Sequence, residues 1–284
     1  MANIKDLKQR IDSITNTRQI TNAMKMVAAA KLRKAQTNAT SLRPYADETA
    51  KMIQTLRHKK AIMDHPLLSE TSKSDKILLF VLTGDKGLCG SFNSQIIKQA
   101  EGYLKENPNC DVVSIGRRGT EFFKKHGVNV IANYSGIFEN LDHKIINKLS
   151  TEVELKYLKE EYKEVVFIYN AFKSAIESII VHKSILPVPA NEELEVSKIE
   201  YLYEPDEETI IEELVNKYIF TEIKRALAES FAAENASRMT AMDSATENAS
   251  ELISELSLEY NRQRQASITT EIIEVSSGAE AIKN

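Results

Sequence analysis

The chain has no tryptophan and few cysteines, prolines and glycines for its 284 residues. Its two cysteines build no disulfide framework, so we expect the protein in a reducing compartment. The longest apolar run, Ile77 to Leu82, is far shorter than the ~20 residues of a membrane-spanning helix. No secretory signal is expected at the start, where charged residues have no apolar stretch behind them. A formal net charge of −4 disfavours a protein that binds nucleic acid with its whole surface.

Glycine is absent from long stretches at both ends of the chain. Eight of the nine glycines lie between Gly84 and Gly136, and the ninth is Gly278. Because glycine supplies turns and weakens helices, the turns are predicted in the middle of the chain. Long uninterrupted helices are predicted on either side of it.

The first segment has the spacing of a coiled coil, in which apolar residues alternate in steps of three and four. These residues are Ile4, Leu7, Ile11 and Ile14, followed by Ala28, Leu32, Ala35, Ala39 and Leu42. Arg18 and Thr21 lie between the two runs, and we expect them to break the register there. Pro44 is expected to kink the helix, which continues to about residue 58.

The last segment predicts a still longer helix. Pro205 followed by acidic residues is a start signal, and neither glycine nor proline follows until Gly278. The apolar seam consists of Val215, Ile219, Ile223, Leu227 and Phe231, followed by Met242, Ala245, Ala249, Leu252 and Leu256. About 70 helical residues would span roughly 105 Å, a length that needs a partner helix. The first segment fits, because residues 1–43 carry a net charge of +7 and residues 206–284 one of −9.

The middle of the chain alternates between strand and helix patterns, which predicts a Rossmann-like α/β domain. Strands are expected at 76–83, 111–115, 128–132, 164–169, 174–185 and 199–202, and helices at 94–105, up to 125 and at 145–162. The predicted fold class is therefore α/β, with this domain inserted into a long antiparallel two-helix coiled coil. The predicted domains are a helix at 1–58, the α/β domain at 75–204 and a helix at 206–281 that pairs with the first.

A glycine-rich loop, Gly84 to Gly90, follows the first predicted strand and precedes a helix. That context suits dinucleotide binding, but the spacing is G-x-x-G-x-x-G rather than G-x-G-x-x-G. A tight structural turn or a docking loop is the alternative. Cys89 lies in this loop before a predicted helix, whose N-terminus can lower the pKa of a thiol. No catalytic triad, close pair of histidines or cofactor motif is recognised, so we predict no catalytic residue, metal or cofactor on this chain.

Three stretches, namely residues 15–34, 85–90 and 234–272, resemble the γ subunits of the rotary F-type ATP synthases. The resemblance implies that the coiled coil is the central stalk inside a ring of three α and three β subunits. The α/β domain would be the foot on the c-ring and the ε subunit. The chain would couple proton translocation to ATP synthesis or hydrolysis without catalysis of its own, because the catalytic sites lie on β. It would be present in one copy, peripheral to the cytoplasmic face of a bacterial plasma (inner) membrane.

The resemblance also implies which residues contact partners. The expected contacts to the β subunits are Met24, Lys25, Lys86, Cys89, Arg238, Arg264, Gln265, Thr269 and Glu271. The expected contacts to the c-ring and ε are Tyr203 and Glu204. For each of these residues the alternative is packing within the chain.

Two other functions fit parts of the sequence. An α/β oxidoreductase would bind a dinucleotide at the glycine loop, and a coiled-coil scaffold would bind nucleic acid through the basic residues of 1–43. Neither explains about 70 turn-free residues with an alanine-rich seam at the end of the chain.

Overall fold

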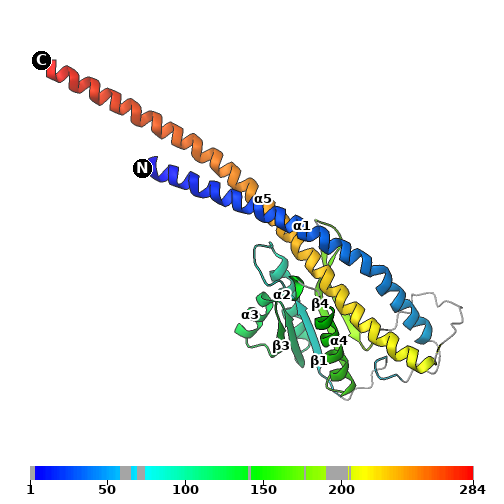
Figure 1. Ribbon diagram of the computed structural model, residues 1–284. Helices are drawn as coiled ribbons and strands as arrows, with labels where there is room; N and C mark the ends of the chain where they lie inside the picture. The colour runs from blue at the N-terminus through cyan, green and yellow to red at the C-terminus, as the bar shows by residue number, and fades with distance from the viewer. Residues whose placement is uncertain are drawn as a thin grey trace. The chain divides into compact units, whose positions relative to one another are not determined.

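The computed structural model describes residues 4–57, 65–68, 74–139, 142–175, 177–189, 204 and 206–283 (Figure 1). The chain falls into two compact units, one formed by Met1–Val27 and Met239–Asn284 and the other by Ala28–Arg238. Helices α1 (Ile4–Arg57) and α5 (Glu207–Lys283) each contribute to both units. Within the described residues, no helix combines the length and the apolar character needed to cross a bilayer.

The two long helices confirm the interpretation of the glycine-poor ends. Helix α1 has 54 residues and continues through Pro44, as predicted. Its last described residue is Arg57, and His58 lies outside the described residues. Helix α5 has 77 residues and includes Gly278, which does not end it. The long turn-free stretch at the end of the chain is therefore one continuous helix.

The first unit is an antiparallel pair of helical segments. Thr246 Oγ1 donates a hydrogen bond to Thr21 Oγ1 at 2.8 Å, and Lys25 Nζ lies 2.5 Å from Asp243 Oδ1. The expected break in register at Arg18 and Thr21 is wrong, because Thr21 is only 9% exposed. After Ile14 the seam continues in steps of four, three and four through the polar residues Arg18, Thr21 and Lys25. A polar layer in a coiled-coil seam fixes the register of the two helices.

The seam on α5 also differs from the expected one at a single place. Leu252 is 47% exposed, whereas Ile253 is half-buried. Ile253 lies seven residues after Thr246 and therefore on the same helix face. The sequence pattern allowed either residue, and Ile253 is the one that is half-buried in the structure.

The second unit contains a five-stranded sheet in the order β3-β2-β1-β4-β5. The strands are β1 (Ile77–Leu82), β2 (Cys110–Ile115), β3 (Val130–Tyr134), β4 (Glu164–Phe172) and β5 (Ser178–Leu186). The first four strands are parallel, and β5 runs antiparallel to β4 at the edge. Every residue of β1 is buried, as expected for the central strand of a sheet covered on both faces.

Helices cover both faces of this sheet (Figure 1). Helices α2 (Phe92–Glu106) and α3 (Arg117–Lys125) contact one face. On the other face, α4 (His143–Leu158) and the first part of α5 share one hydrophobic core with side chains of β1, β2 and β4. Phe80 and Phe167 stack in this core with ring centroids 4.4 Å apart. A short 3-10 helix, Ile137–Glu139, connects β3 to the α4 region.

The architecture confirms the predicted fold class of a Rossmann-like α/β part between two long helices. The strand expected at 174–185 is β5, but it is antiparallel, so the sheet is not parallel throughout. The strand expected at 199–202 lies outside the described residues. The domain boundaries expected near residues 58, 75 and 206 stay predictions.

Candidate functional site

The glycine loop is held in place by hydrogen bonds between its residues Gly84 and Asp85 and later parts of the chain. Gly84 N–H donates to Asn93 Oδ1 at 2.8 Å, and Gly84 O accepts from Arg118 N–H at 3.2 Å. The Asp85 carboxylate accepts the N–H groups of Arg117 at 3.0 Å and of Gly136 at 2.9 Å. These contacts attach the loop to the segments that follow β2 and β3. The loop therefore has a fixed conformation at the carboxyl edge of the sheet.

Leu88 lies at the tip of this loop in a strained conformation. Its φ is +60°, in the left-handed region that costs a non-glycine residue about 1–2 kcal/mol. Its side chain is 62% exposed. Strain combined with an exposed apolar side chain is typical of a residue that contacts a partner. Sequence reasoning missed Leu88, although a leucine between two glycines of a polar loop was the available signal.

Cys89 differs from its exposed neighbour, because its side chain is only 2% exposed. Its Sγ lies 3.2 Å from Asn93 Nδ2, which donates to it. Burial raises the pKa of the Cys89 thiol, and this effect outweighs the nearby Arg238, which lowers it. The thiol is therefore protonated at neutral pH and is no activated nucleophile. As a partner contact Cys89 stays a prediction, and in the structure it packs inside the loop.

Helix α5 lies across this loop. Ser237 Oγ donates to Cys89 O at 2.6 Å, and Arg238 Nη2 donates to Gly87 O at 3.3 Å. Arg238 also forms an ion pair of 2.6 Å with Glu234, whose residue exposure is 5%. A Cβ atom on Gly84 would lie 2.9 Å from Glu234 Oε1, so the Glu234 carboxylate lies close against the backbone of the loop.

This arrangement excludes the dinucleotide reading of the loop. In Rossmann folds the pyrophosphate lies over the first glycine turn, against the N-terminus of the following helix. Here the Glu234 carboxylate lies against Gly84. A carboxylate repels phosphate, and Ser237 and Arg238 of α5 already bond to the backbone of the loop. The oxidoreductase alternative therefore loses its binding site.

Met24 and Lys25 lie in the first unit on α1. The Lys25 side chain is 37% exposed and forms its ion pair with Asp243 of the same chain, while Met24 is half-buried. Their contacts with β stay predictions. Sequence reasoning missed three apolar side chains on the same segment that are more exposed than Met24 and Lys25. These are Ile20, Met26 and Val27, with exposed fractions of 60%, 63% and 57%.

The end of α5 carries the remaining expected contacts. Because Thr21 faces Thr246 in an antiparallel pair, Ile4 faces about residue 263, and no described part of α1 lies beyond it. Arg264, Gln265, Thr269 and Glu271 are all exposed on this unpaired part of α5. So are four large apolar residues, namely Ile268, Ile272, Ile273 and Val275. A helix end that exposes so many apolar side chains marks a protein-contact surface.

The foot contacts are less well defined. Glu204 is exposed, and Tyr203 lies outside the described residues.

The nucleic-acid alternative is weakened as well, because two of its basic residues are already ion-paired. Lys25 contacts Asp243, and Arg43 contacts Glu229 at 3.0 Å.

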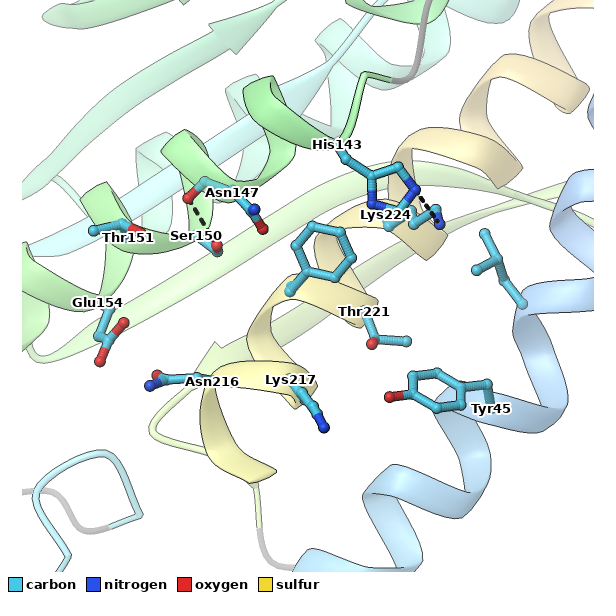
Figure 2. A pocket seen from close by; sticks show the side chains of 12 residues that line it. Tyr45, His143, Asn147, Ser150, Thr151, Glu154, Asn216, Lys217, Thr221 and Lys224 are labelled. Carbon is cyan, nitrogen blue, oxygen red and sulfur yellow. Dashed lines mark hydrogen bonds between the residues drawn. The ribbon is translucent and has the colours of Figure 1, made fainter. Parts of the chain in front are cut away.

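A pocket of about 580 Å³ lies among α1, α4 and α5 in the second unit (Figure 2). His143 stacks on Phe220 with centroids 5.6 Å apart, and Lys224 Nζ lies 3.5 Å from His143 Nε2. Glu154 lines the pocket too, and burial raises its pKa.

Comparisons with known proteins agree with the geometry. A family model described as ATP synthase matches residues 3–282. The ATP synthase gamma chains of Chlorobium limicola and Geobacter metallireducens are 42% and 44% identical to this chain, and each alignment covers 100% of both proteins.

Solved structures give the same result. A chain in the central stalk and c-ring structure of the Tetrahymena thermophila mitochondrial ATP synthase has a TM-score of 0.64 at 26% identity, covering 80% of this chain and 99% of that one. A chain of the Euglena gracilis mitochondrial ATP synthase has a TM-score of 0.68 at 17% identity, covering 98% and 94%, and supports the fold alone. With full-length matches in sequence and the same fold, the chain belongs to the family of ATP synthase γ chains.

Proposed function

We propose that this chain is the central-stalk rotor of an F-type ATP synthase, which transmits rotation between a proton-driven c-ring and the catalytic ring of three α and three β subunits. The chain itself is non-catalytic, and the catalytic sites lie on β. One copy serves each complex, at the cytoplasmic face of a bacterial plasma membrane, with ε as a further partner. The observation that carries the proposal is the end of α5, which extends past α1 and exposes a row of isoleucines.

The mechanism follows from differential contact. A rotor that does no chemistry can still change a catalytic subunit. It does so by making more favourable contacts with one conformation of that subunit than with another. An asymmetric shaft inside a ring meets each β subunit differently and therefore favours a different conformation in each. The exposed side chains near the end of α5 and on residues 20–27 of α1 supply such contacts.

The β contacts we propose comprise the expected residues and Leu88. Lys86 and Leu88 are both exposed at the tip of the glycine loop, where a cation and an apolar side chain can meet an acidic, partly apolar partner loop. Arg238 supports this tip from behind through Gly87 O. Exposed ionic contacts of this kind weaken with added salt, whereas the apolar contact of Leu88 does not.

Rotation is the direct test of the proposed function. A bead is attached through Lys98→Cys, an exposed site on α2, in a chain whose Cys89 and Cys110 are replaced by serine. The assembled complex is immobilised through its α/β ring. With ATP we expect rotation in one direction with three pauses per turn, and none without ATP. A bead that stays still while the immobilised complex hydrolyses ATP contradicts the proposal.

Leu88→Asp should uncouple the complex. The change removes an apolar contact worth about 2 kcal/mol when a leucine is fully buried by a partner. We expect the number of protons pumped per ATP hydrolysed to fall at least about threefold, measured in membrane vesicles. Leu155→Asp is the matched control, because Leu155 is 51% exposed on α4, outside the glycine loop. Equal coupling in the two variants would remove Leu88 from the contact surface.

A further inference from the structure

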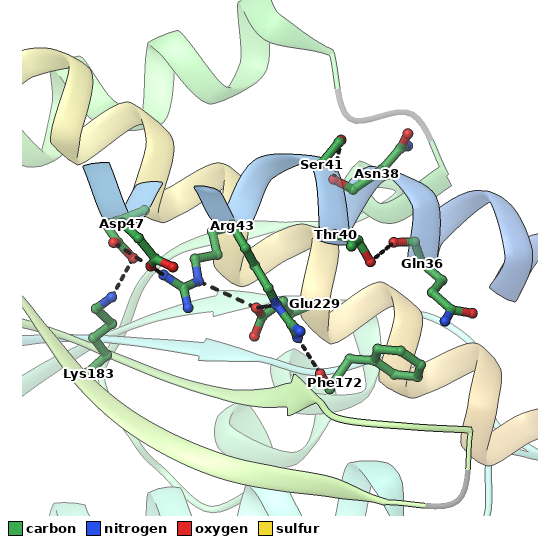
Figure 3. A network of polar contacts seen from close by, with 11 residues as sticks. Gln36, Asn38, Thr40, Ser41, Arg43, Asp47, Phe172, Lys183 and Glu229 are labelled. Atoms are coloured by element: carbon green, nitrogen blue, oxygen red, sulfur yellow. Dashed lines mark hydrogen bonds and ion pairs between the residues drawn. The ribbon is translucent and has the colours of Figure 1, made fainter. Parts of the chain in front are cut away.

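Six charged side chains of the second unit form one continuous ion-pair network, shown in part in Figure 3. We call it the junction network, and it consists of Arg43 and Asp47 on α1, Lys183 on β5, and Glu222, Arg225 and Glu229 on α5. Lys183 Nζ lies 2.6 Å from Glu222 Oε2, and Arg43 Nε lies 3.0 Å from Glu229 Oε1. Arg225 bridges the two halves.

Arg225 contacts all three acids of the network. Its Nη1 lies 2.9 Å from Asp47 Oδ1 and 3.9 Å from Glu222 Oε1, and its Nε lies 3.4 Å from Glu229 Oε1. Burial disfavours the charged guanidinium, but these acids raise the pKa of Arg225 above its ordinary value. With three cations and three anions, the network is neutral as a whole.

The network is buried at its centre. The side chains of Glu222 and Glu229 are 2% and 3% exposed. Buried ion pairs stabilise a fold little, because desolvation offsets the attraction, and well-packed apolar residues often replace them without loss. What ion pairs add is a fixed geometry between the elements that carry them. The network is therefore best explained by the positions it holds rather than by the stability it supplies.

The network connects the long helices to the sheet. Arg43 on α1 also donates a hydrogen bond to Phe172 O, at the end of β4. Lys183 anchors α5 to β5. Both helices are thus tied to the last two strands by directional polar contacts.

The direct apolar contact between the helices in this region is less directional than the ion pairs. The buried residues of α1 here include Ala35, Ala39 and Ala46, and those of α5 include Ala226 and Ala228. Alanine side chains interlock little, and apolar contact has no preferred direction. Ile223 and Leu227 pack α5 into the core with the sheet, and the ion pairs add contacts of defined direction to this packing.

We propose that the junction network transfers torque between the two long helices and the α/β sheet. Its six residues are positioning residues, since they hold the helices at a fixed angle to the sheet. The inference rests on the proposed rotor function and goes beyond it, because it assigns the transfer of force within the chain to a defined set of side chains.

The test measures how well ATP hydrolysis drives proton pumping when a proton gradient opposes it. Lys183→Met combined with Glu222→Leu removes the 2.6 Å ion pair and the longer 3.9 Å contact of Glu222 with Arg225, at constant net charge and similar volume. We expect the melting temperature and the ATP hydrolysis rate without a proton gradient to stay near wild type. The largest proton gradient that ATP hydrolysis sustains in vesicles should fall at least twofold, and torque on a rotating bead should fall in the same proportion. Lys183→Arg keeps the ion pair and should retain both.

The same chain offers a matched control. Lys173→Met with Glu177→Leu removes an ion pair of 3.4 Å that is exposed between β4 and β5. This control should sustain the wild-type gradient. Asp47→Asn is a milder second variant, because Asp47 is 56% exposed, and it should lower the gradient less than the double variant does. The inference is overturned if the junction variants, folded and assembled, produce wild-type torque. Absence of rotation in the wild type would instead overturn the rotor function.

Discussion

Gly116→Ala should destabilise the α/β unit by at least about 4 kcal/mol, among the largest effects of any single substitution. Gly116 has φ +95°, and a Cβ atom on it would lie 1.9 Å from Thr83 O. That oxygen cannot move aside, because Thr83 N–H donates to Ile115 O at 2.8 Å and Gly116 N–H donates to Tyr134 O at 2.7 Å. Since the chain has no tryptophan, unfolding by denaturant is best followed by circular dichroism.

Gly102→Ala is the matched control for this prediction. Gly102 lies within α2, and a Cβ atom there would meet nothing within 4 Å. Alanine is the better helix former, so this variant should gain up to about 1 kcal/mol. Destabilisation of both variants to the same degree would mean that the close approach to Thr83 does not set the requirement for glycine at 116.

Arg238→Ala should cost about 3 kcal/mol at neutral pH, because it leaves Glu234 buried without its ion pair. Burial raises the pKa of Glu234, and Arg238 holds it lower than burial alone would. Without Arg238 the pKa of Glu234 rises further. An acid with a raised pKa in the folded state stabilises the fold at low pH and loses that contribution as pH rises through the folded-state pKa.

The loss caused by Arg238→Ala should therefore grow from about pH 5 to about pH 8. At the lower pH Glu234 becomes protonated, and removing Arg238 from a neutral carboxyl group costs less free energy of unfolding. Arg117→Ala is the control, since Arg117 is exposed and its ion pair with Glu121 spans 3.5 Å on the surface. Its effect should stay within about 0.5 kcal/mol at every pH. A loss in Arg238→Ala that is constant over this range would mean that Glu234 does not titrate as described.

Local patterns predicted the long helices and most strands because the forces that form them are local. The absence of glycine from both ends corresponds to α1 and α5, and the apolar run Ile77 to Leu82 is β1. The antiparallel direction of β5 could not be predicted, since strand direction depends on which neighbour a strand pairs with. Likewise, Thr21 looked like a break in the seam, but its partner Thr246 is 225 residues away.

The candidate site was predictable only in part, for the same reason. The glycine loop was recognised from its spacing and Arg238 by resemblance, but their mutual contact joins residues about 150 positions apart. Glu234 has no signal of its own, because many exposed glutamates lie on the same helix, and only the approach of Gly84 distinguishes it. A leucine between two glycines of a polar loop was a signal for Leu88, but its exposure and its positive φ cannot be read from residue type.

The shared core of the α/β unit has a consequence for biosynthesis. Its side chains come from α1, the sheet, α4 and the first part of α5, with Ile53 near one end of the chain and Leu227 near the other. A nascent chain that has not yet reached Leu227 has this face of the sheet covered by α4 but not yet by α5. Such a face binds chaperones and is prone to aggregate. The α/β unit thus completes its folding late in translation, after most of the chain has left the ribosome.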